Sequence, residues 1–470
     1  MIKTDHIEIS SAQQQFLPAN LAWHFRVVPK NINDGEVCFY IDSTQKADEA
    51  KEELEVILGA NISFEPVEKE LIQTALGKYF RQAKGKKETE LKITAETDFV
   101  DRIIQEANAL DSSDIHIEIY ENKGRVRIRI DGHLIEKYKV PLESYSELVN
   151  KIKIKSNLDI SEKRLPQDGR IQYGDFDIRV SILPTLHGEK IVMRILGQDA
   201  TGISIDSLGM TSFEKKNYLE GIKKPNGIIL ISGPTGSGKT TTLYATLKLL
   251  NEEKRNIVTV EDPIEYTLEG INQVQLKENI GLTFTAALRS FLRQDPDVIM
   301  LGEIRDAETA QMAIRAALTG HLVLSTIHTN SAWGTVSRLI DMGVPSFLLA
   351  NTLNSSVAQR LVRKLCDNCK TEEKVNLEDL PSTFDPKNAP KTHHVSVGCD
   401  LCHFTGYKGR QALYEIIPIQ GVLTEKIKNQ DFNVQEILKE NGIKNLSERA
   451  LELWSSGETT LEEIYSLLIE

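Results

Sequence analysis

Cysteine and long apolar runs are both scarce in this sequence of 470 residues. Five cysteines are too few for a disulfide-rich secreted domain. No stretch approaches the ~20 apolar residues that span a bilayer. The first ten residues, MIKTDHIEIS, carry charges where a signal peptide would be apolar. We therefore expect a cytoplasmic protein that reaches a membrane only through partner proteins.

Positive charge is also in deficit, because 56 Lys and Arg residues stand against 68 Asp and Glu residues. The formal net charge is −12, whereas binding along nucleic acid needs a dense cationic surface. Hydrophobic residues make up 40% and charged residues 26%, the balance of a folded globular protein. The composition thus opposes direct nucleic-acid contact, and the length predicts two to four domains.

The N-terminal block, residues 1–80, is predicted to form a small α/β domain. An apolar run at 38–41 is typical of a strand, and helical spacing of apolar residues appears at 45–58 and 71–79. The following segment, 81–96, begins with polar and charged residues almost without apolar side chains, as linkers do.

Two larger blocks follow the linker. Residues 97–200 predict an α+β domain, in which strand 125–130 alternates strictly and ends at the hairpin signal Asp131-Gly132. Residues 205–470 alternate strands with helices, which predicts a mostly parallel α/β sheet with further helices at the C-terminus.

A phosphate-binding loop is the strongest motif. The apolar run 227–232 suits a buried parallel strand, GPTGSGKT follows at 233–240, and leucines then recur at helical spacing. Such a loop turns backbone N–H groups and a helix start toward phosphate, while Lys239 adds a charge and Thr240 a hydroxyl for Mg²⁺. The expected ATP-binding residues are Gly233, Pro234, Thr235, Gly236, Ser237, Gly238, Lys239, Thr240 and Thr241.

Carboxylates at the ends of two further strands complete the predicted site. Strand 298–301 leads to Glu303, which we assign to Mg²⁺ together with Thr240. Strand 257–260 leads to Glu261, which we predict orients or deprotonates the attacking water. Solvated acids at strand ends are the alternative interpretation.

Two histidines bracket a fourth predicted strand at 321–327. His328 lies at its carboxyl end and is predicted to sense the γ-phosphate or the attacking water, and we assign the same role to His321. A lone histidine is more often structural, so that alternative stays open for both.

These motifs resemble, in order, the Walker A, Asp, Walker B and His boxes of the secretion ATPase superfamily. The resemblance is strongest to type II secretion (GspE-like) and type IV pilus extension (PilB-like) ATPases. The matching stretches are 233–242 (GPTGSGKTTT), 259–265 (TVEDPIE), 295–306 (DPDVIMLGEIRD) and 320–330 (GHLVLSTIHTN), with 113–118, 127–132 and 188–190 in the second block.

The resemblance implies a RecA-like P-loop ATPase domain preceded by a PAS-like α+β domain and an N-terminal domain that is truncated relative to the family. It also implies a homo-hexamer that uses ATP hydrolysis to assemble a secretion pseudopilus or a pilus. Its partners would be an inner-membrane platform and cytoplasmic docking proteins.

Two arginines of the second block are predicted to reach a nucleotide. If strands 176–183 and 190–196 form a hairpin centred on 186–187, Arg179 and Arg194 face each other across the strands. Opposed like charges destabilise a sheet, and a visiting anion would relieve that cost. The resemblance places arginine fingers at these two positions, which can act on a neighbouring subunit. A solvated basic face is the alternative.

Another arginine pair lies on a predicted helix at 284–293. Arg289 and Arg293 are four residues apart and share one face of that helix. The resemblance implies that both line the subunit interface near the nucleotide, and ordinary surface arginines are the alternative.

Four of the five cysteines form two C-x-x-C knuckles, Cys366 with Cys369 and Cys399 with Cys402. Two knuckles complete the closed tetrahedral geometry of structural Zn²⁺, so we predict a zinc module at 366–402 within the third block. Free thiols or a redox couple are the alternatives. In the resembling family this module is typical of extension and secretion ATPases and missing from retraction ATPases.

Three functions are compatible with the phosphate loop. The first is a motor ATPase whose hydrolysis drives pseudopilus or pilus assembly. The second is a nucleic-acid translocase or helicase on the same RecA-like core, which the net charge of −12 opposes. The third is an ATP-binding scaffold with little hydrolysis, which the set of acids opposes.

Overall fold

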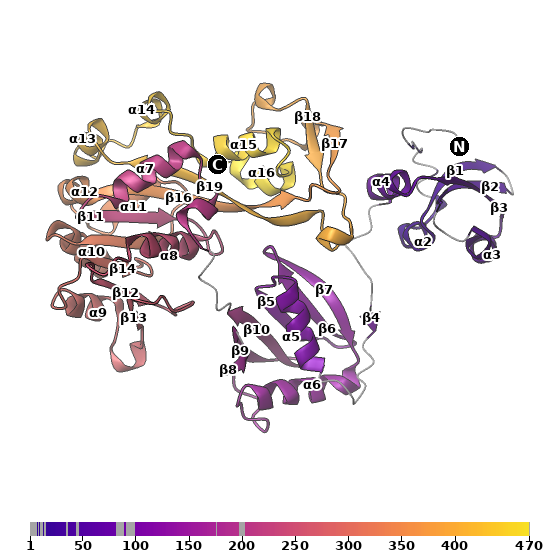
Figure 1. Ribbon diagram of the computed structural model, residues 1–470, viewed down its shortest axis with the longest axis horizontal. Helices are drawn as coiled ribbons and strands as arrows, with labels where there is room; N and C mark the ends of the chain where they lie inside the picture. Colours follow the sequence, from indigo (N-terminus) through magenta and orange to yellow (C-terminus); the bar gives the residue numbers. More distant parts are fainter. Residues whose placement is uncertain are drawn as a thin grey trace. The chain divides into compact units, whose positions relative to one another are not determined.

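The computed structural model describes residues 7, 9, 13, 16–33, 36–43, 47–80, 89–90, 99–174, 176–196 and 203–469. The chain divides into two compact units. Figure 1 labels the helices and strands of both. The first unit comprises 1–87, 363–409 and 453–465, and the second comprises 88–362, 410–452 and 466–470. Most of the predicted linker lies outside the described residues, apart from β4 (Thr89–Glu90).

The N-terminal block carries a three-stranded sheet of order β1-β2-β3. β1 pairs antiparallel with β2, and β2 pairs parallel with β3. Helices α3 and α4 correspond to the two predicted helices, and their apolar stripes supply the fully buried Leu54 and Ile72. The elements are α2 (Ala19–Phe25), β1 (Val27–Asn33), β2 (Glu36–Asp42), α3 (Ala47–Leu58), β3 (Asn61–Val67) and α4 (Lys69–Tyr79).

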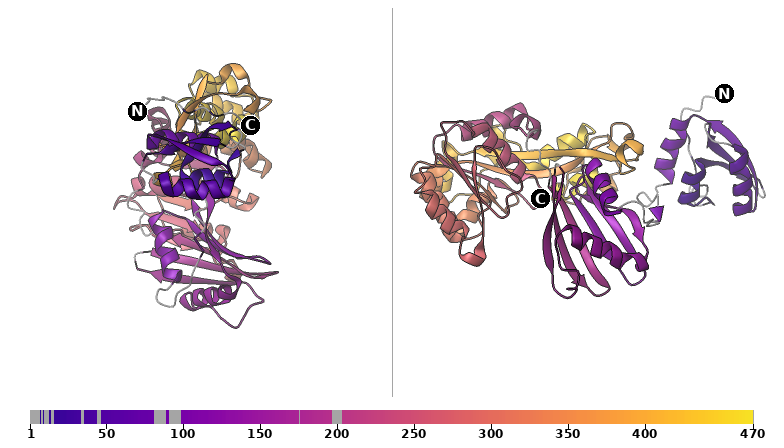
Figure 2. Two further views of the ribbon diagram at one scale, coloured as in Figure 1. Left: turned by 90° about the vertical axis from the view of Figure 1, so that its right-hand side faces the viewer. Right: turned by 60° about the horizontal axis from the view of Figure 1, so that its bottom comes forward.

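The second block folds as a seven-stranded sheet of order β4-β7-β6-β5-β10-β9-β8. Helices α5 and α6 pack on one face of this sheet and form one buried apolar cluster with its strands (Figure 2). The predicted turn Asp131-Gly132 joins β6 to β7, and both residues have positive φ, as this hairpin turn requires. The elements are α5 (Phe99–Ala109), β5 (Asp114–Ile119), β6 (Gly124–Ile130), β7 (His133–Val140), α6 (Leu142–Lys155), β8 (Gln167–Tyr173), β9 (Phe176–Thr185) and β10 (Gly188–Leu196).

The third block contains a second seven-stranded sheet, of order β13-β12-β14-β15-β11-β16-β19. Neighbouring strands from β13 to β16 pair parallel, as the alternation of strands and helices predicted. Parallel pairing sets the carboxyl ends of β11, β12, β14 and β15 along one edge of the sheet. The strands are β11 (Gly227–Ser232), β12 (Ile257–Glu261), β13 (Asn272–Gln275), β14 (Val298–Leu301), β15 (Leu322–Ile327), β16 (Leu353–Leu365) and β19 (Tyr407–Pro418).

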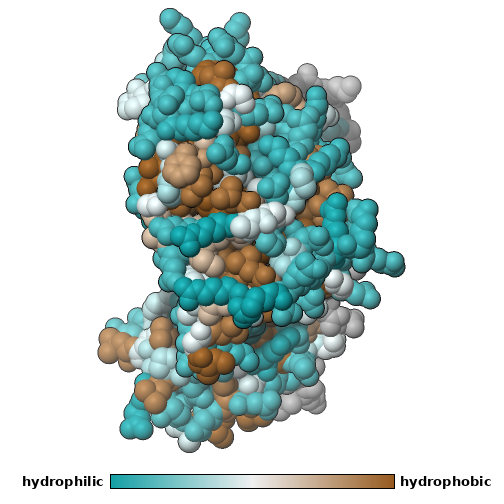
Figure 3. Space-filling view, turned by 90° about the vertical axis from the view of Figure 1, so that its left-hand side faces the viewer, coloured by the Kyte–Doolittle hydropathy of each residue, from teal (hydrophilic) through white to brown (hydrophobic). Residues whose placement is uncertain are grey.

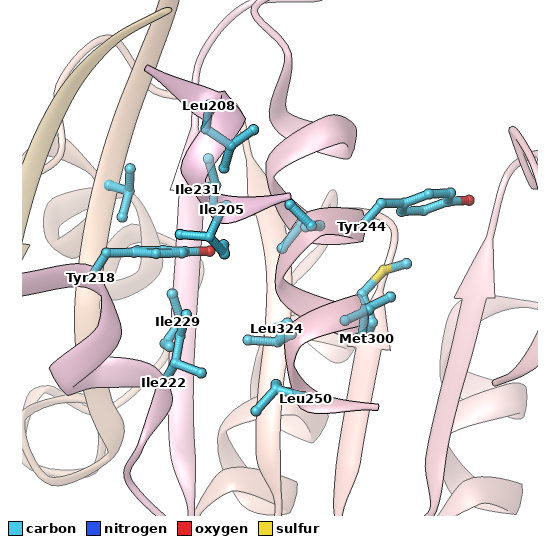
Figure 4. Close-up of a cluster of buried hydrophobic side chains, with 14 of the residues drawn as sticks. Ile205, Leu208, Tyr218, Ile222, Ile229, Ile231, Tyr244, Leu250, Met300 and Leu324 are labelled. Atoms are coloured by element: carbon cyan, nitrogen blue, oxygen red, sulfur yellow. The ribbon is translucent and has the colours of Figure 1, made fainter. Parts of the chain in front are cut away.

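A large apolar cluster fixes helices α7 and α8 of this block against its sheet. Tyr218 and Ile222 of α7 meet Ile229 and Ile231 of β11, and Leu324 of β15 lies beside them (Figure 4). Every residue of β11 is buried, so both faces of the central strand are covered. The helices are α7 (Ser212–Ile222), α8 (Lys239–Leu250), α9 (Phe284–Phe291), α10 (Ala307–Leu318), α11 (Gly334–Asp341), α12 (Ser346–Thr352), α13 (Val422–Lys428) and α14 (Gln435–Glu440).

The hydropathy of the surface and of the helices bears on membrane contact. Hydrophobic residues on the face drawn in Figure 3 lie in separate groups between hydrophilic ones, as on most folded surfaces. Among the described residues, no helix is both long enough and apolar enough to cross a bilayer.

The cysteine module is built on a two-stranded sheet, and residues 453–465 of the last two helices belong to the same unit. One buried arginine ties these parts together, since Arg363 at the end of β16 donates to Glu463 of α16 through Nε at 3.0 Å and Nη2 at 2.5 Å. Its guanidinium carbon also lies 3.8 Å from the ring centroid of Tyr407. The elements are β17 (Thr371–Lys374), β18 (Thr392–Val395), α15 (Leu446–Ser455) and α16 (Leu461–Ile469).

We expect Arg363→Met to lower the free energy of unfolding of this unit by about 3–5 kcal/mol, because it leaves the largely buried carboxylate of Glu463 without its cation. Urea unfolding followed by tryptophan fluorescence measures the loss. Lys428→Met removes an exposed pair with Glu425 and is the control, with an expected loss below about 1 kcal/mol. Equal losses in the two variants would contradict the anchoring role of Arg363.

Candidate active site and metal centre

The phosphate loop joins the central strand β11 to helix α8, as predicted. Strand β11 ends at Ser232, and α8 begins at Lys239. The ammonium of Lys239 curls back over the loop and donates to the carbonyl oxygens of Gly233 at 2.8 Å and Pro234 at 3.0 Å. The free N–H groups of the first helical turn and this ammonium therefore share one anion-binding corner.

Two glycines let the loop rest directly on strand β16. A Cβ atom added to Gly233, whose φ is +150°, would lie 2.4 Å from the backbone oxygen of Gln359. A Cβ atom added to Gly238, whose φ is +85°, would lie 2.8 Å from Nε2 of the Gln359 side chain. Other residue types would lift the loop away from the strand.

Glu303 and His328 meet at the carboxyl edge of the sheet. The Nε2 atom of His328, just beyond β15, lies 3.4 Å from Oε2 of Glu303, just beyond β14. Arg305 donates to the other carboxylate oxygen at 2.5 Å. Burial raises the pKa of Glu303, but the hydrogen bond and charge of Arg305, aided by His328, outweigh it and lower the pKa overall. Glu303 is thus an ionised carboxylate, the ligand type that Mg²⁺ prefers.

Lys239 shares the electrostatic environment of this edge. Burial lowers the pKa of the Lys239 ammonium, the charge of Glu303 raises it, and the charge of Arg360 lowers it. The predicted phosphate lysine and the predicted metal ligand therefore belong to one charged site.

Glu261, the predicted general base, is buried and accepts three hydrogen bonds. They come from the hydroxyl of Tyr244, from Oγ1 of Thr259 at 2.6 Å and from Nε2 of Gln273 at 3.1 Å. A carboxylate offers about four acceptor positions, so these donors leave about one for a water molecule. The catalytic role of Glu261 stays a prediction.

His321 lies at the other end of strand β15 from His328. Its Nδ1 atom lies 2.9 Å from the carbonyl oxygen of Ala316, at the amino end of the strand. Six strand residues span about 20 Å. The predicted contact of His321 with a phosphate on Lys239 of the same chain does not fit this position.

Three arginines cross the exposed face of the second block. Arg179 of β9 pairs with Arg194 of β10, the register that the hairpin predicted. Arg170 of β8 is the other neighbour of Arg179, a third member that the sequence analysis did not identify. The Nε atom of Arg194 lies 3.0 Å from Oδ1 of Asp114. Burial raises the pKa of Asp114, but hydrogen bonds, that of Arg194 first, lower it overall.

The second predicted arginine pair lies on α9 and just beyond it. Arg289 donates to Glu308 at 2.8 Å, and Arg293 donates to the carbonyl oxygen of Arg289 at 2.8 Å. Both arginines are exposed. Their predicted place at a subunit interface therefore stays a prediction.

The four predicted cysteines converge on one point, with all sulfur atoms within 4.8 Å of one another. The Sγ–Sγ separations include 3.9 Å for Cys366 and Cys399 and 3.8 Å for Cys369 and Cys402. Four thiolates about 2.3 Å from one Zn²⁺ in a tetrahedron lie ~3.8 Å apart. The cluster therefore has the dimensions of a closed metal site.

Backbone N–H groups point at the sulfur atoms of this cluster. Gly398 donates to Cys369 at 3.3 Å, and Cys402 receives N–H groups from Cys399 at 3.1 Å and from Gly406 at 3.3 Å. Such donors stabilise thiolates over thiols. The donor set thus fits a cation held by four ionised cysteines.

Comparison with known proteins decides the family. The family described as "Type II/IV secretion system protein" matches residues 90–466. The chain belongs to this family. It is 46% identical over 395 residues to the type IV pilus assembly ATPase PilB of Pseudomonas aeruginosa, covering 80% of this chain and 69% of that protein. It is 48% identical over 335 residues to the type II secretion system protein E of the same organism, covering 70% and 67%.

Solved structures support the same assignment. The pilus retraction motor PilT with bound ADP matches with a TM-score of 0.54 at 26% identity, covering 79% of this chain and 97% of that one. The ATPase DotB of Legionella pneumophila matches in fold with a TM-score of 0.60 at 20% identity, covering 82% and 99%. The chain is therefore a secretion and pilus-assembly family ATPase, and the predicted ATP hydrolase is confirmed.

Proposed function

We propose that this chain is the motor ATPase of a type IV pilus or type II secretion machine and works as a homo-hexamer. The observation that carries the proposal is the phosphate loop with the Glu303–His328 contact at 3.4 Å beside it. The third block would be the RecA-like motor domain and the second a PAS-like domain. The chain would be cytoplasmic and reach the inner membrane through platform and docking proteins. Its net charge of −12 favours protein partners over nucleic acid.

Hydrolysis would proceed at the corner between α8 and the carboxyl ends of β14 and β15. Lys239 exchanges its two loop carbonyls for the β- and γ-phosphates, and Thr240 and Glu303 would hold Mg²⁺. When bound, Mg²⁺ offsets the negative charge of the phosphates. His328 presents its imidazole to the γ-phosphate side, and its contact with Glu303 orients the ring. Glu261 remains the proposed acceptor for a proton of the attacking water.

A neighbouring subunit would complete the site. Arg170 pairs with Asp177, Arg179 donates to the Ile264 carbonyl oxygen at 2.8 Å, and Arg194 pairs with Asp114. The three guanidinium groups still lie side by side on neighbouring strands, and an anion would stabilise them further. Arg179 and Arg194 are proposed to contact the nucleotide held by the next protomer, with Arg289 and Arg293 at the same interface. A ring makes such head-to-tail contacts at every interface.

The four-cysteine cluster is proposed to hold Zn²⁺ through Cys366, Cys369, Cys399 and Cys402. Four thiolates fill the tetrahedron and leave no position for water, so the ion would be structural. Its role would be to join the loop between β16 and β17 to the loop between β18 and β19.

Mixed rings test the shared active site. Arg194→Ala and Lys239→Ala subunits, each inactive alone, are co-assembled and assayed for phosphate release. A shared site requires an intact Lys239 in one subunit and an intact Arg194 in its neighbour. About a quarter of the interfaces in an equal mixture therefore regain both and can hydrolyse ATP. Lys239→Ala mixed with Glu303→Gln is the matched control, because both changes fall in the same half-site, and it should stay inactive. Equal recovery in both mixtures, or none in either, would refute the trans arrangement.

A further inference from the structure

Side chains of strands β16 and β19 hold the segment that carries His328 by hydrogen bonds to its backbone. It runs from the end of β15 to the start of α11 and includes residues 328–333. The hydroxyl of Ser356 donates to the carbonyl oxygen of Ala332 at 2.7 Å. The carboxylate of Glu415 accepts the Ala332 N–H group at 3.1 Å. Both peptide groups around Ala332 are thus fixed by buried side chains from the two strands.

Arg360 connects the same segment to the phosphate loop. Its Nη2 atom donates to the carbonyl oxygen of Asn330 at 2.9 Å, two residues after His328. Its Nη1 atom donates to the Gln359 carbonyl at 3.2 Å and would lie 3.3 Å from a Cβ atom added to Gly233. One planar guanidinium therefore touches the support of the phosphate loop and the backbone of the His328 segment.

The placement of Arg360 follows from the strand register. Ser232, the last residue of β11, pairs with Ala358 of β16. Strand β16 then continues past the end of β11 and carries Gln359 and Arg360 beneath the phosphate loop. The Gln359 side chain also accepts the hydroxyl of Thr242 in α8 at 2.8 Å. This stretch of β16 is therefore the floor on which the loop lies.

Arg360 and Glu415 are two buried charged residues on adjacent strands, with exposed fractions of 8% and 5%. Burial raises the pKa of Glu415, and the Ala332 N–H group and the charge of Arg360 only partly offset this, so the pKa is raised overall. Buried charges are costly unless hydrogen bonds and opposite charges compensate them. Apolar side chains would pack against the His328 segment at a lower cost in desolvation free energy. The presence of Arg360 and Glu415 there points to a specific role for these two residues.

We propose that Arg360 and Glu415 are positioning residues that hold the His328 segment in register with the phosphate loop. A nucleotide gripped by Lys239 then meets the His328 imidazole at a fixed distance. The role of Arg360 depends on its fork of donors, because a lysine carries the charge but does not bridge two carbonyls in one plane. The inference rests on the proposed role of His328 in hydrolysis.

The test compares Arg360→Lys and Glu415→Leu with the unchanged chain in steady-state ATP hydrolysis. We expect kcat to fall by about 10- to 100-fold in both, because small misplacements of reacting groups have effects of that order. We expect the dissociation constant for a fluorescent ATP analogue to change by less than about threefold, because Lys239 and the loop glycines remain. Glu415→Leu removes the acceptor of the Ala332 N–H group and replaces a buried carboxylate by an apolar side chain, so it remains informative if Arg360→Lys unfolds.

A double-mutant cycle shows whether Arg360 acts through His328. If it does, Arg360→Lys lowers kcat much less in a His328→Gln background than in the unchanged chain. Equal fold-losses in both backgrounds, or nucleotide binding that weakens in parallel with kcat, would overturn the inference. If His328→Gln alone turns over ATP at the unchanged rate, the proposed role of His328 fails first, and the inference falls with it.

Two serines of β16 supply matched controls. Ser356→Ala removes a hydrogen bond to the Ala332 carbonyl oxygen, whereas the hydroxyl of the neighbouring Ser355 donates to the Ile417 carbonyl oxygen of β19 at 3.4 Å. Ser356→Ala should lower kcat several-fold, and Ser355→Ala should leave it unchanged. A loss of the same size in both would assign the effect to strand packing and overturn the inference.

Discussion

Replacement of Lys239 by alanine is expected to lower ATP hydrolysis by roughly 10²–10³-fold or more, because it removes the one full positive charge that the phosphate loop brings to the phosphates. The ammonium already lies over the loop, 2.8 Å from the Gly233 carbonyl oxygen. In the variant, only backbone N–H groups and the helix start would face the phosphates. Phosphate release under saturating ATP and Mg²⁺ measures the loss.

Lys248→Ala is the matched control for this prediction. Lys248 lies on the same helix, α8, and its ammonium contacts the carbonyl oxygen of Ile203 at 3.4 Å, away from the phosphate loop. The same side chain is removed from the same helix, so general loss of helix stability affects both variants. Activity of Lys239→Ala within tenfold of the unchanged chain, or a comparable loss in Lys248→Ala, would contradict the assigned loop function.

Features that depend on local spacing could be predicted from the sequence. The phosphate loop, its flanking strand and helix, and the Asp131-Gly132 turn each arise from neighbouring residues. The pairing of Arg179 with Arg194 also followed, because a short hairpin fixes the register of its strands. The cysteine cluster belongs to the same class. Each C-x-x-C knuckle is formed by neighbouring residues, and only the contact between the two knuckles depends on residues far apart in the chain.

Features that depend on partners far along the chain could not be predicted. Glu261 appeared available at a strand end, but Tyr244 of α8 and Gln273 of β13 occupy its oxygens in the fold. Arg360 and Glu415 reach the His328 segment because β16 lies beside β11 and β19 lies beside β16. A signal was present in the polar pair Gln359-Arg360 between the apolar residues 357–358 and 361–362, but its target could not be read from spacing.

The role of His321 stays a prediction, and its position shows a constraint of chain direction rather than of distance. Parallel strands place ligands at their carboxyl ends, so the two histidines bracketing β15 had to lie on opposite edges of the sheet. The seven-residue spacing suggested the same role for both histidines, although the length of strand β15 keeps them apart. Chain direction within the sheet therefore carries as much information about a site as residue type.

The second large effect is expected at the cysteine cluster, where Cys399→Ser should abolish zinc binding and unfold the segment around 366–406. Structural zinc contributes about 10–16 kcal/mol of apparent binding free energy in small zinc domains, and that energy is folding energy where no other core exists. Glycines add to this dependence, because a Cβ atom added to Gly398 or Gly406 would lie within 3 Å of neighbouring heavy atoms. The knuckle loops thus have tight, specific backbone shapes that the metal would maintain.

Elemental analysis of protein purified without chelators, combined with limited proteolysis, tests this expectation. The unchanged chain should carry one zinc ion, whereas Cys399→Ser should carry almost none and be cut within the module. Cys38→Ser is the control, because Cys38 lies on β2 of the N-terminal block and is the one cysteine outside the cluster. Its zinc content and cleavage pattern should not change. Well under one zinc ion per unchanged chain would remove the metal assignment, whereas full zinc content with unaltered cleavage in Cys399→Ser would show that three thiolates suffice and that the fourth ligand is not structural.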